Sequence, residues 1–332
     1  MHPTQILFSG EKSFPVLPAV DHYAGSEKLI RKALALQREM GPLFDVTCDC
    51  EDGARAGDEA EHALMCAEII HSAENRFNRV AARIHDITHP HWRADIDILV
   101  GGAGQRLAFL TLPKPRALRD VVEQIAELRR VEDVYGIGRR VPVHVMIETH
   151  GALKDAWAIA ALESVESLDF GIMDFVSAHH GALPSSVMKS PGQFQHPLMV
   201  RAKSEIVAAA LGNGVVPTHN VSTELKDGTS VFADARQARR EFGFLRMWSI
   251  HPNQVRPILD AMRPDFAEVA DAALILTTAQ DQDWGPIKHQ DRLHDRASYR
   301  YYWQLLQRAH ATGMDLPSEV VDRFFLPDLS KY

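Results

Sequence analysis

The chain has 332 residues, of which 45% are hydrophobic and 24% are charged, and its formal net charge is -8. This composition is typical of a globular protein with a large core, and the dispersed negative charge argues against nucleic acid or an anionic membrane as a partner. No apolar run approaches the roughly 20 residues that cross a bilayer, and the N-terminal segment lacks the pattern of a secretion signal. The three cysteines, an odd number, fit a reducing compartment better than a disulfide framework, so we expect a cytoplasmic protein.

Short apolar runs alternate with helical patterns along the chain. The first run is TQILFSG, and a helical pattern over 26–40 separates it from the strand-like FDVTCD that begins at Phe44. Six further strands are predicted in the runs RVAARIH, LAFLTLPK, VPVHVMIET, SLDFGIMD, GVVPTHN and FLRMWSIHP. Helical patterns lie between several of these runs, as over 117–131 and 201–214. Strands that alternate with helices indicate a parallel sheet, and eight of them predict a closed (β/α)8 TIM barrel.

The last part of the chain has a different pattern. NQVRPILDAM and PDFAEVADAALILTTAQ are helical, DWGPIKHQDRLHD is typical of a loop, and RASYRYYWQLLQRAH is an amphipathic helix with an aromatic face. We therefore predict a TIM-barrel catalytic domain over 1–282. A small helical extension over 283–332 would act as a lid or in oligomerisation.

The segment FDVTCDCEDGA gathers four carboxylates within a few positions, those of Asp45, Asp49, Glu51 and Asp52. Because side chains alternate along a strand, the acidic residues of the strand share one face with Thr47, opposite the cysteines. An edge strand with a solvated acidic face is the simplest interpretation. Other predicted strands also end in polar residues, namely Arg83, His85, Lys114, Glu148, Asp174 and His251. Strand C-termini meet at the mouth of a barrel, so we predict that the carboxylates belong to an active site there.

The residue types at these strand ends suggest a chemistry. Glu148 and Asp174 supply two hard oxygen ligands from neighbouring strands, which suits Mg²⁺. A guanidinium such as that of Arg83 beside the metal would bind a carboxylate or a developing enolate through its planar fork. We also expect Arg83 to form an ion pair with Asp49 or Glu51, which would hold the guanidinium in place.

Six segments resemble motifs of the citrate lyase β-subunit-like family, which lies within the HpcH/HpaI aldolase superfamily and includes malyl-CoA and citramalyl-CoA lyases. CDCEDGA is similar to the family's D-L-E-D-A strand, ARIH to its R-V-N, and LPK to the corresponding family segment. IETHG is similar to I-E-T-x-G, FGIMD to F-G-x-x-D, and SIHPNQV to I-H-P-x-Q. These segments follow the family's order from about Asp45 to Val255.

The resemblance implies roles for particular residues. Glu148 and Asp174 would hold Mg²⁺, Arg83 would grip a substrate oxygen, and Glu51 and Asp52 would surround the metal and the arginine as parts of the catalytic site. Family members with a C-terminal lid carry a catalytic aspartate that reaches a neighbouring subunit, and RLHDRASY resembles that segment, which nominates Asp295. An aspartate before a helix is also a typical N-cap, and this alternative stays open. A homo-oligomer, either a trimer or a hexamer, is implied as well.

We therefore predict a Mg²⁺-dependent carbon–carbon lyase that cleaves or forms a 3-hydroxyacyl-CoA thioester, with acyl-CoA and a 2-oxo acid as the small molecules it binds. Three departures from the family leave the substrate open. His85 stands where the family has Asn, the N-terminal segment lacks an Arg-Ser pair found near the CoA site, and His219 and Asn220 replace Ile-Asp. One alternative is a CoA-independent metal-dependent aldolase acting on a hydroxy-oxo acid. Another is a non-catalytic paralogue that binds a dicarboxylate.

Overall fold

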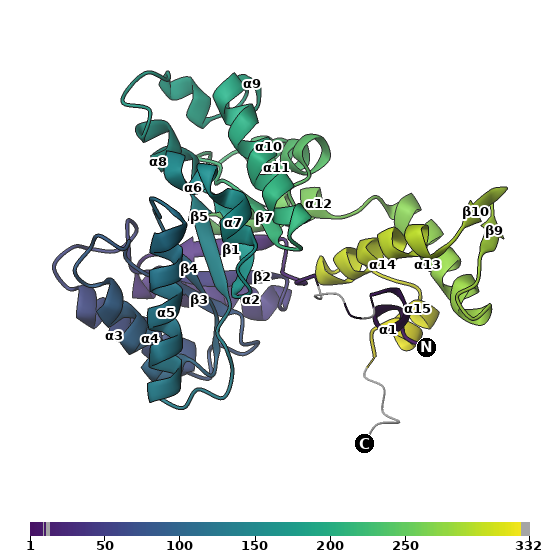
Figure 1. Ribbon diagram of the computed structural model, residues 1–332, viewed down its shortest axis with the longest axis horizontal. Helices are drawn as coiled ribbons and strands as arrows, with labels where there is room; N and C mark the ends of the chain where they lie inside the picture. The colour runs from purple at the N-terminus through teal and green to yellow at the C-terminus, as the bar shows by residue number, and fades with distance from the viewer. Residues whose placement is uncertain (9, 11–13, 327–332) are drawn as a thin grey trace. The chain divides into compact units, whose positions relative to one another are not determined.

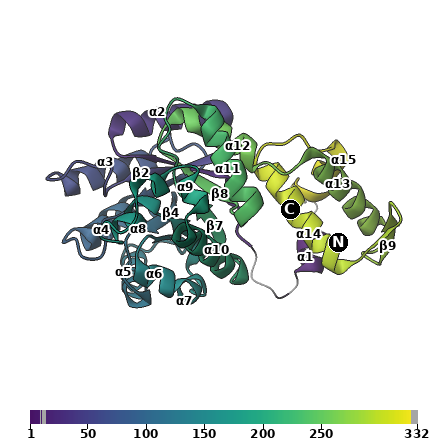
Figure 2. The same cartoon turned by 90° about the horizontal axis from the view of Figure 1, so that it is seen from above.

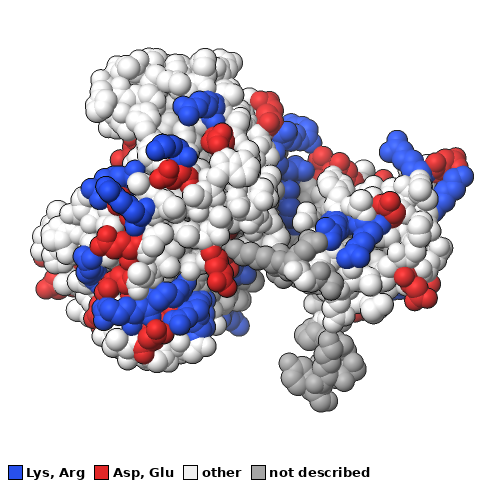
Figure 3. All heavy atoms as spheres, viewed as in Figure 1, with Lys and Arg blue, Asp and Glu red and all other residues white. Residues whose placement is uncertain are grey.

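The computed structural model describes residues 1–8, 10 and 14–326 of the chain (Figure 1). The chain forms two compact units, one of Leu17–Met262 and one that combines Met1–Val16 with Arg263–Tyr332. Acidic and basic side chains are interspersed over the face shown in Figure 3. No helix in the described ranges is long and apolar enough to cross a membrane.

The unit of Leu17–Met262 is a closed barrel of parallel strands, as predicted. Each strand pairs with the next along the chain, and β8 closes the barrel on β1. The strands are β1 (Val20–Ala24), β2 (Phe44–Asp49), β3 (Val80–Arg83), β4 (Leu107–Leu112), β5 (Val143–Ile147), β6 (Val165–Phe170), β7 (Val216–His219) and β8 (Arg246–Ser249). The (β/α)8 fold is therefore confirmed.

Helices surround the barrel strands, as Figure 2 shows. They are α2 (Glu27–Met40), α3 (Glu59–His71), α4 (Trp92–Ala103), α5 (Leu118–Val134), α6 (His150–Lys154), α7 (Ala156–Ala160), α8 (Ile172–Ser177), α9 (Gly192–Gln195), α10 (Pro197–Gly212), α11 (Gly228–Gln237) and α12 (Pro252–Met262), with a 3-10 turn η1 (Ser185–Met188) and a π-helical turn η2 (Ala238–Phe242). Their apolar faces bury a continuous core against the strands. In α2, for example, Ile30, Ala33 and Leu34 are buried.

The prediction of the first strand is wrong. The segment TQILFSG contributes to helix α1 (Pro3–Leu7), which has Pro3 in its first turn and His2 as an N-cap. The first barrel strand is instead VDHYA, where two polar residues interrupt the apolar run. Neighbouring strands satisfy both of them, because Thr47 Oγ1 donates to Asp21 Oδ1 over 2.7 Å and His22 Nδ1 lies 2.8 Å from Ser249 Oγ.

The second unit has its own apolar core. Besides α1 it contains α13 (Phe266–Asp281), β9 (Ile287–His289), β10 (Arg292–His294), α14 (Arg296–Ala311) and α15 (Ser318–Phe324). Leu276 of α13 packs in one cluster with Tyr299 and Trp303 of α14. The compact units therefore divide the chain after Met262, whereas the sequence suggested a boundary after residue 282.

The segment DWGPIKHQDRLHD forms the antiparallel β9–β10 hairpin, so the loop predicted there is wrong. Its turn residues Gln290 and Asp291 both have positive φ, 49° and 60°. Such turns usually carry Asn-Gly or Asp-Gly, and the absence of that signal explains why the hairpin was missed.

The interior of the barrel contains buried charges. Strand β2 lies between β1 and β3, so the alternative of a solvated edge strand is wrong, and Asp45 is fully buried. Nη2 of Arg246 lies 3.0 Å from Asp21 Oδ2 and 2.8 Å from Asp45 Oδ2. Burial raises the pKa of Asp21 to about 7 and that of Asp169 to about 6, because loss of solvation outweighs the attraction of Arg246.

We expect these two carboxyls to make the barrel less stable as the pH rises. In an unfolded chain an aspartate titrates near ~3.9, so between roughly pH 4 and pH 7 the folded state keeps a proton that the unfolded state has lost. The stabilisation from Asp21 is complete below about pH 4 and is lost as the pH rises through its folded pKa of about 7. A pKa difference of about 3 units corresponds to about 4 kcal/mol. Urea midpoints from about pH 5 to about pH 8 would show a flatter dependence for Asp21→Asn than for the parent. Identical slopes would contradict this prediction.

Candidate active site

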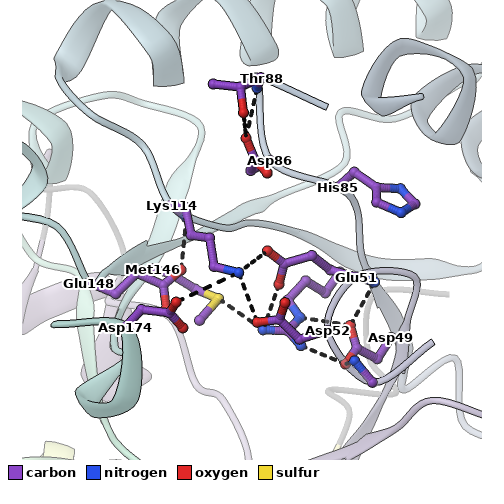
Figure 4. Close-up of polar contacts among 12 residues, drawn as sticks. Asp49, Glu51, Asp52, His85, Asp86, Thr88, Lys114, Met146, Glu148 and Asp174 are labelled. Atoms are coloured by element: carbon purple, nitrogen blue, oxygen red, sulfur yellow. Dashed lines mark hydrogen bonds and ion pairs between the residues drawn. The ribbon is translucent and has the colours of Figure 1, made fainter. Parts of the chain in front are cut away.

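Asp49 at the end of β2 and Glu51 just after it hold the guanidinium of Arg83 at the end of β3. Figure 4 labels these two acidic residues. Asp49 accepts two hydrogen bonds from it, 2.7 Å from Nε and 2.5 Å from Nη2, and Glu51 Oε2 lies 3.0 Å from Nη1. Backbone N–H groups of Glu51 and Gly53 donate to the same Asp49 carboxylate, which fixes its orientation. The predicted ion pair is therefore present with both Asp49 and Glu51.

The electrostatics of this pair keep both partners ionised. Burial alone would lower the pKa of Arg83, but Asp49 and Glu51 raise it well above its usual value. Burial alone would raise the pKa of Asp49, but the attraction of Arg83 keeps it below its usual value. The result is a buried, permanently charged guanidinium with a fixed orientation.

Lys114, at the loop after β4, links the acidic segment to the neighbouring strand ends. Its Nζ lies 2.6 Å from Glu51 Oε1, 2.8 Å from Asp52 Oδ2 and 3.7 Å from Asp174 Oδ1. Burial alone would lower the pKa of Lys114, but its hydrogen bonds to Asp52 and Glu51 raise it. The sequence marked Lys114 only as a polar strand end, and no local spacing relates it to Glu51.

Glu148 directly follows β5, and Asp174 lies in the first turn of α8, which follows the adjacent strand β6. Glu148 is 1% exposed at the end of β5, and its Oε1 accepts a hydrogen bond of 2.8 Å from the backbone N–H of Lys114. Its Oε2 is buried without a hydrogen-bond partner among the described residues. A Cβ on Gly171 would lie 2.1 Å from this oxygen and 2.7 Å from Glu148 Cβ, so the N-cap position of α8 must carry glycine.

The donor set fits a divalent cation. Burial, followed by the nearby Asp174, raises the pKa of Glu148 well above its usual value. A buried carboxylate oxygen without a partner, beside a second carboxylate, is an arrangement that a bound cation stabilises. Both ligands are hard oxygen donors, and Asp174 is partly exposed, so waters and substrate could complete the shell that Mg²⁺ prefers.

A cavity of about 180 Å³ lies at the barrel mouth. Asp49, Asp52, Arg83, Glu148 and Asp174 line it together with Asn220, Tyr23 and Trp248. The rings of Tyr23 and Trp248 stack with centroids 4.2 Å apart and form an apolar wall. Asn220 was noted in the sequence only as a departure from the family, yet its side-chain oxygen is buried at this cavity without a hydrogen-bond partner in the described structure.

Two histidines that follow strand ends, His85 and His251, are not among the described residues that line this cavity. His85 turns toward α4, where Nδ1 lies 2.7 Å from Asp95 Oδ2 and the ring stacks on His89. His251 Nδ1 accepts a hydrogen bond of 3.2 Å from the backbone N–H of Asn253, near the start of α12. Both were predicted at the mouth from strand position alone, and neither is among the described residues that line this cavity.

Asp295 lies in the other unit and caps helix α14. Its Oδ1 accepts hydrogen bonds from the backbone N–H groups of Ala297 and Ser298, and Ser298 Oγ accepts one from the Asp295 N–H. The N-cap alternative is therefore present in the structure, and a catalytic role for Asp295 stays a prediction.

The family model described as HpcH/HpaI aldolase/citrate lyase matches residues 43–252, most of the barrel unit. The chain belongs to this family. The resemblance found in the motifs is thereby confirmed.

The names of similar proteins are consistent with membership of this family. A solved citrate lyase from Burkholderia xenovorans is 51% identical, covers 98% of this chain and 100% of its own, and superposes with a TM-score of 0.83. The L-malyl-CoA/beta-methylmalyl-CoA lyase of Cereibacter sphaeroides is 26% identical over 80% of this chain and 86% of its own. The CitE protein of Mycobacterium tuberculosis, in complex with magnesium, acetoacetate and coenzyme A, shares the fold at 19% identity, with a TM-score of 0.64 over 89% of this chain and 98% of its own. The predicted enzyme class, a carbon–carbon lyase, is confirmed by relatives named as lyases.

Proposed function

We propose that this enzyme is a Mg²⁺-dependent lyase that cleaves or forms a 3-hydroxyacyl-CoA thioester, with acyl-CoA and a 2-oxo acid as the other reactants. The observation that carries the proposal is the pair of carboxylates of Glu148 and Asp174 in one small cavity with the fixed guanidinium of Arg83. Support comes from the malyl-CoA lyases among the relatives and from M. tuberculosis structures with magnesium and oxaloacetate or pyruvate.

Charge at the site explains why an anionic substrate needs a cation there. Five carboxylates, those of Asp49, Glu51, Asp52, Glu148 and Asp174, surround two basic side chains, Arg83 and Lys114. Without a divalent cation, a 2-oxo acid would enter a site with surplus negative charge. When bound by Glu148 and Asp174, Mg²⁺ would polarise the substrate oxygens as a Lewis acid.

Arg83 would stabilise the negative charge that develops as the carbon–carbon bond breaks. Asp49 holds its Nε and Nη2, so the guanidinium needs no reorganisation when the substrate charge changes. Lys114 neutralises Glu51 and Asp52 and holds Glu148 through its backbone N–H. The apolar wall of Tyr23 and Trp248 would exclude water from the reacting carbons.

A CoA-independent aldolase acting on a hydroxy-oxo acid is the second candidate. The observation in its favour is that the strand identified as β1, VDHYA, also lacks the Arg-Ser pair. A panel of 3-hydroxyacyl-CoA thioesters and free hydroxy-oxo acids, assayed for 2-oxo acid release with Mg²⁺ and with chelator, separates the two. Turnover of the thioesters supports the proposal, and turnover of the free acids alone favours the aldolase. The absence of any turnover would favour the non-catalytic, dicarboxylate-binding paralogue.

We expect Asp295→Asn to be as stable as the parent but nearly inactive. Asparagine caps a helix about as well as aspartate, whereas an amide cannot exchange the proton on the acyl-CoA carbon, a role worth roughly 100-fold to 10,000-fold. Thermal melting and steady-state turnover would measure both properties. The matched control is Ser298→Ala, which removes the reciprocal capping bond but keeps the carboxylate, and it should lose some stability but no activity. Parental turnover in Asp295→Asn would leave this residue with its capping role alone.

A further inference from the structure

A second cavity, of about 320 Å³, lies at the end of the barrel opposite the candidate active site. Its lining residues stand at or just before the starts of strands: Arg79 precedes β3, Arg106 precedes β4, Arg139 lies before β5, and Glu166 is near the start of β6. In a parallel barrel the strand starts share one face and the strand ends the other. This cavity is therefore separate from the site that contains Glu148.

Arginine dominates the charge of this cavity. Three guanidinium groups, those of Arg79, Arg106 and Arg139, accompany a single acidic lining residue, Glu166. Behind the lining, Asp45 Oδ1 lies 3.7 Å from Arg79 Nη1 while its Oδ2 lies 2.8 Å from Arg246 Nη2. Glu132 also attracts Arg139, but its carboxylate pairs with Arg129 and Arg140. The cavity thus has a surplus of positive charge that Asp45 only partly offsets.

Uncharged oxygen atoms hold two of these arginines in place. Arg106 donates to Asn78 Oδ1 and to the main-chain carbonyls of His71, Ser72 and Asn75. Arg139 donates to the carbonyls of Gly104 and Leu107, at 3.1 and 2.7 Å. These bonds fix the positions of the guanidinium groups without neutralising them.

Arg139 differs from Arg83 in how far nearby carboxylates compensate for its burial. Burial lowers the pKa of Arg139 more than Glu132 and Glu166 raise it, whereas the pKa of Arg83 is raised by its carboxylates. The side chain of Arg79 is 35% exposed, and its Nη1 makes a long ion pair of 3.7 Å with Asp45 Oδ1. Its N–H donors are therefore accessible from the cavity.

We propose that this cavity binds a small phosphate-bearing anion. Guanidinium forks match phosphate oxygens in pairs, and a dianionic phosphate would balance the positive surplus better than a monocarboxylate. The volume holds a phosphate group with several further heavy atoms, as in a phosphorylated metabolite or pyrophosphate. Because the cavity and the mouth lie at opposite ends of the barrel, the anion and a 2-oxo acid would bind at the same time.

Calorimetric titration of pyrophosphate into the full-length protein with chelator present tests the proposal. We expect one pyrophosphate per chain, the same affinity in the presence of pyruvate, and at least about tenfold weaker binding by Arg79→Gln, the loss of a charge-assisted contact. The matched control is Arg130→Gln on the exposed surface of α5, where the arginine pairs with Glu127. Competition by pyruvate, equal binding by Arg79→Gln and the parent, or an equal loss in Arg130→Gln would overturn the proposal.

A second measurement uses the parent protein and needs no variant to fold. Arginine modification by phenylglyoxal, mapped by mass spectrometry, should slow at Arg79 when pyrophosphate is present and stay unchanged at Arg130. Equal modification of Arg79 with and without pyrophosphate would overturn the site. Titrations with inorganic phosphate and with a phosphorylated sugar then distinguish the source of the phosphate. Tighter binding of the sugar phosphate identifies a metabolite, and equal binding identifies free phosphate.

Discussion

Glu148→Gln is expected to abolish Mg²⁺ binding and to lower lyase turnover by more than about 100-fold while leaving the barrel folded. The glutamine oxygen can still accept the backbone N–H of Lys114, so the local structure should persist. The change removes the negative charge of a carboxylate whose Oε2 is buried without a described partner. In chelator, the variant should therefore melt at the same temperature as the parent or higher, because burying an unpaired carboxylate is costly.

Asp174→Asn is the companion change, and it should also lose Mg²⁺ and activity. The matched control is Asp86→Asn, at a partly exposed carboxylate that accepts a hydrogen bond of 2.7 Å from the backbone N–H of Thr88 (Figure 4). An asparagine can keep this bond, so metal binding and turnover should stay at parental values. Calorimetry with Mg²⁺ and a turnover assay measure both quantities. If Glu148→Gln and Asp174→Asn bind Mg²⁺ like the parent, the metal assignment is wrong.

Arg83→Lys should have the second large effect, a loss of roughly 100-fold in kcat/KM. Lysine keeps the charge, but a single ammonium cannot reproduce the paired bonds to Asp49 and the contact with Glu51. The buried carboxylates of Asp49 and Glu51 would lose some of their hydrogen bonds to a cation, so we also expect a lower melting temperature. Near-parental turnover would show that the site needs only a positive charge at this position.

Asp49→Asn separates positioning from direct contact at the same site. It removes the charge that orients Arg83 but leaves Arg83 and its contact with Glu51. If the orientation of the fork matters, this variant should lose activity although Asp49 needs no contact with substrate. Because Asp49 fixes the orientation of a guanidinium that stays charged without it, the loss should appear in kcat more than in KM.

Much of the site could be predicted from the sequence because its residues share one simple property. Arg83 ends β3, Glu148 directly follows β5, and Asp174 lies in the first turn of the helix after β6; parallel strand ends converge in a barrel. The structure places all three around one cavity with Asp49 and Asp52. Their roles in metal and substrate binding remain predictions for the variants above.

Other parts of the structure have no local signal in the sequence. Strand β1 was missed because Asp21 and His22 break its apolar run, and only bonds to neighbouring strands make these buried polar residues acceptable. The β9–β10 hairpin was missed because Gln290 and Asp291 adopt positive φ without the usual turn residues. In each case an interaction with a distant segment or an unusual backbone conformation outweighed local preference.

The barrel and the family could be inferred from the sequence, because strand and helix periodicities and the order of short motifs are properties of neighbouring residues. The way in which side chains from different strands meet could be seen only in the folded chain. Lys114 reaches Glu51, His85 turns away to Asp95, and the arginines at the starts of strands surround a cavity. These outcomes depend on strand register, side-chain rotamer and burial across long sequence separations, and local periodicity contains no information about them.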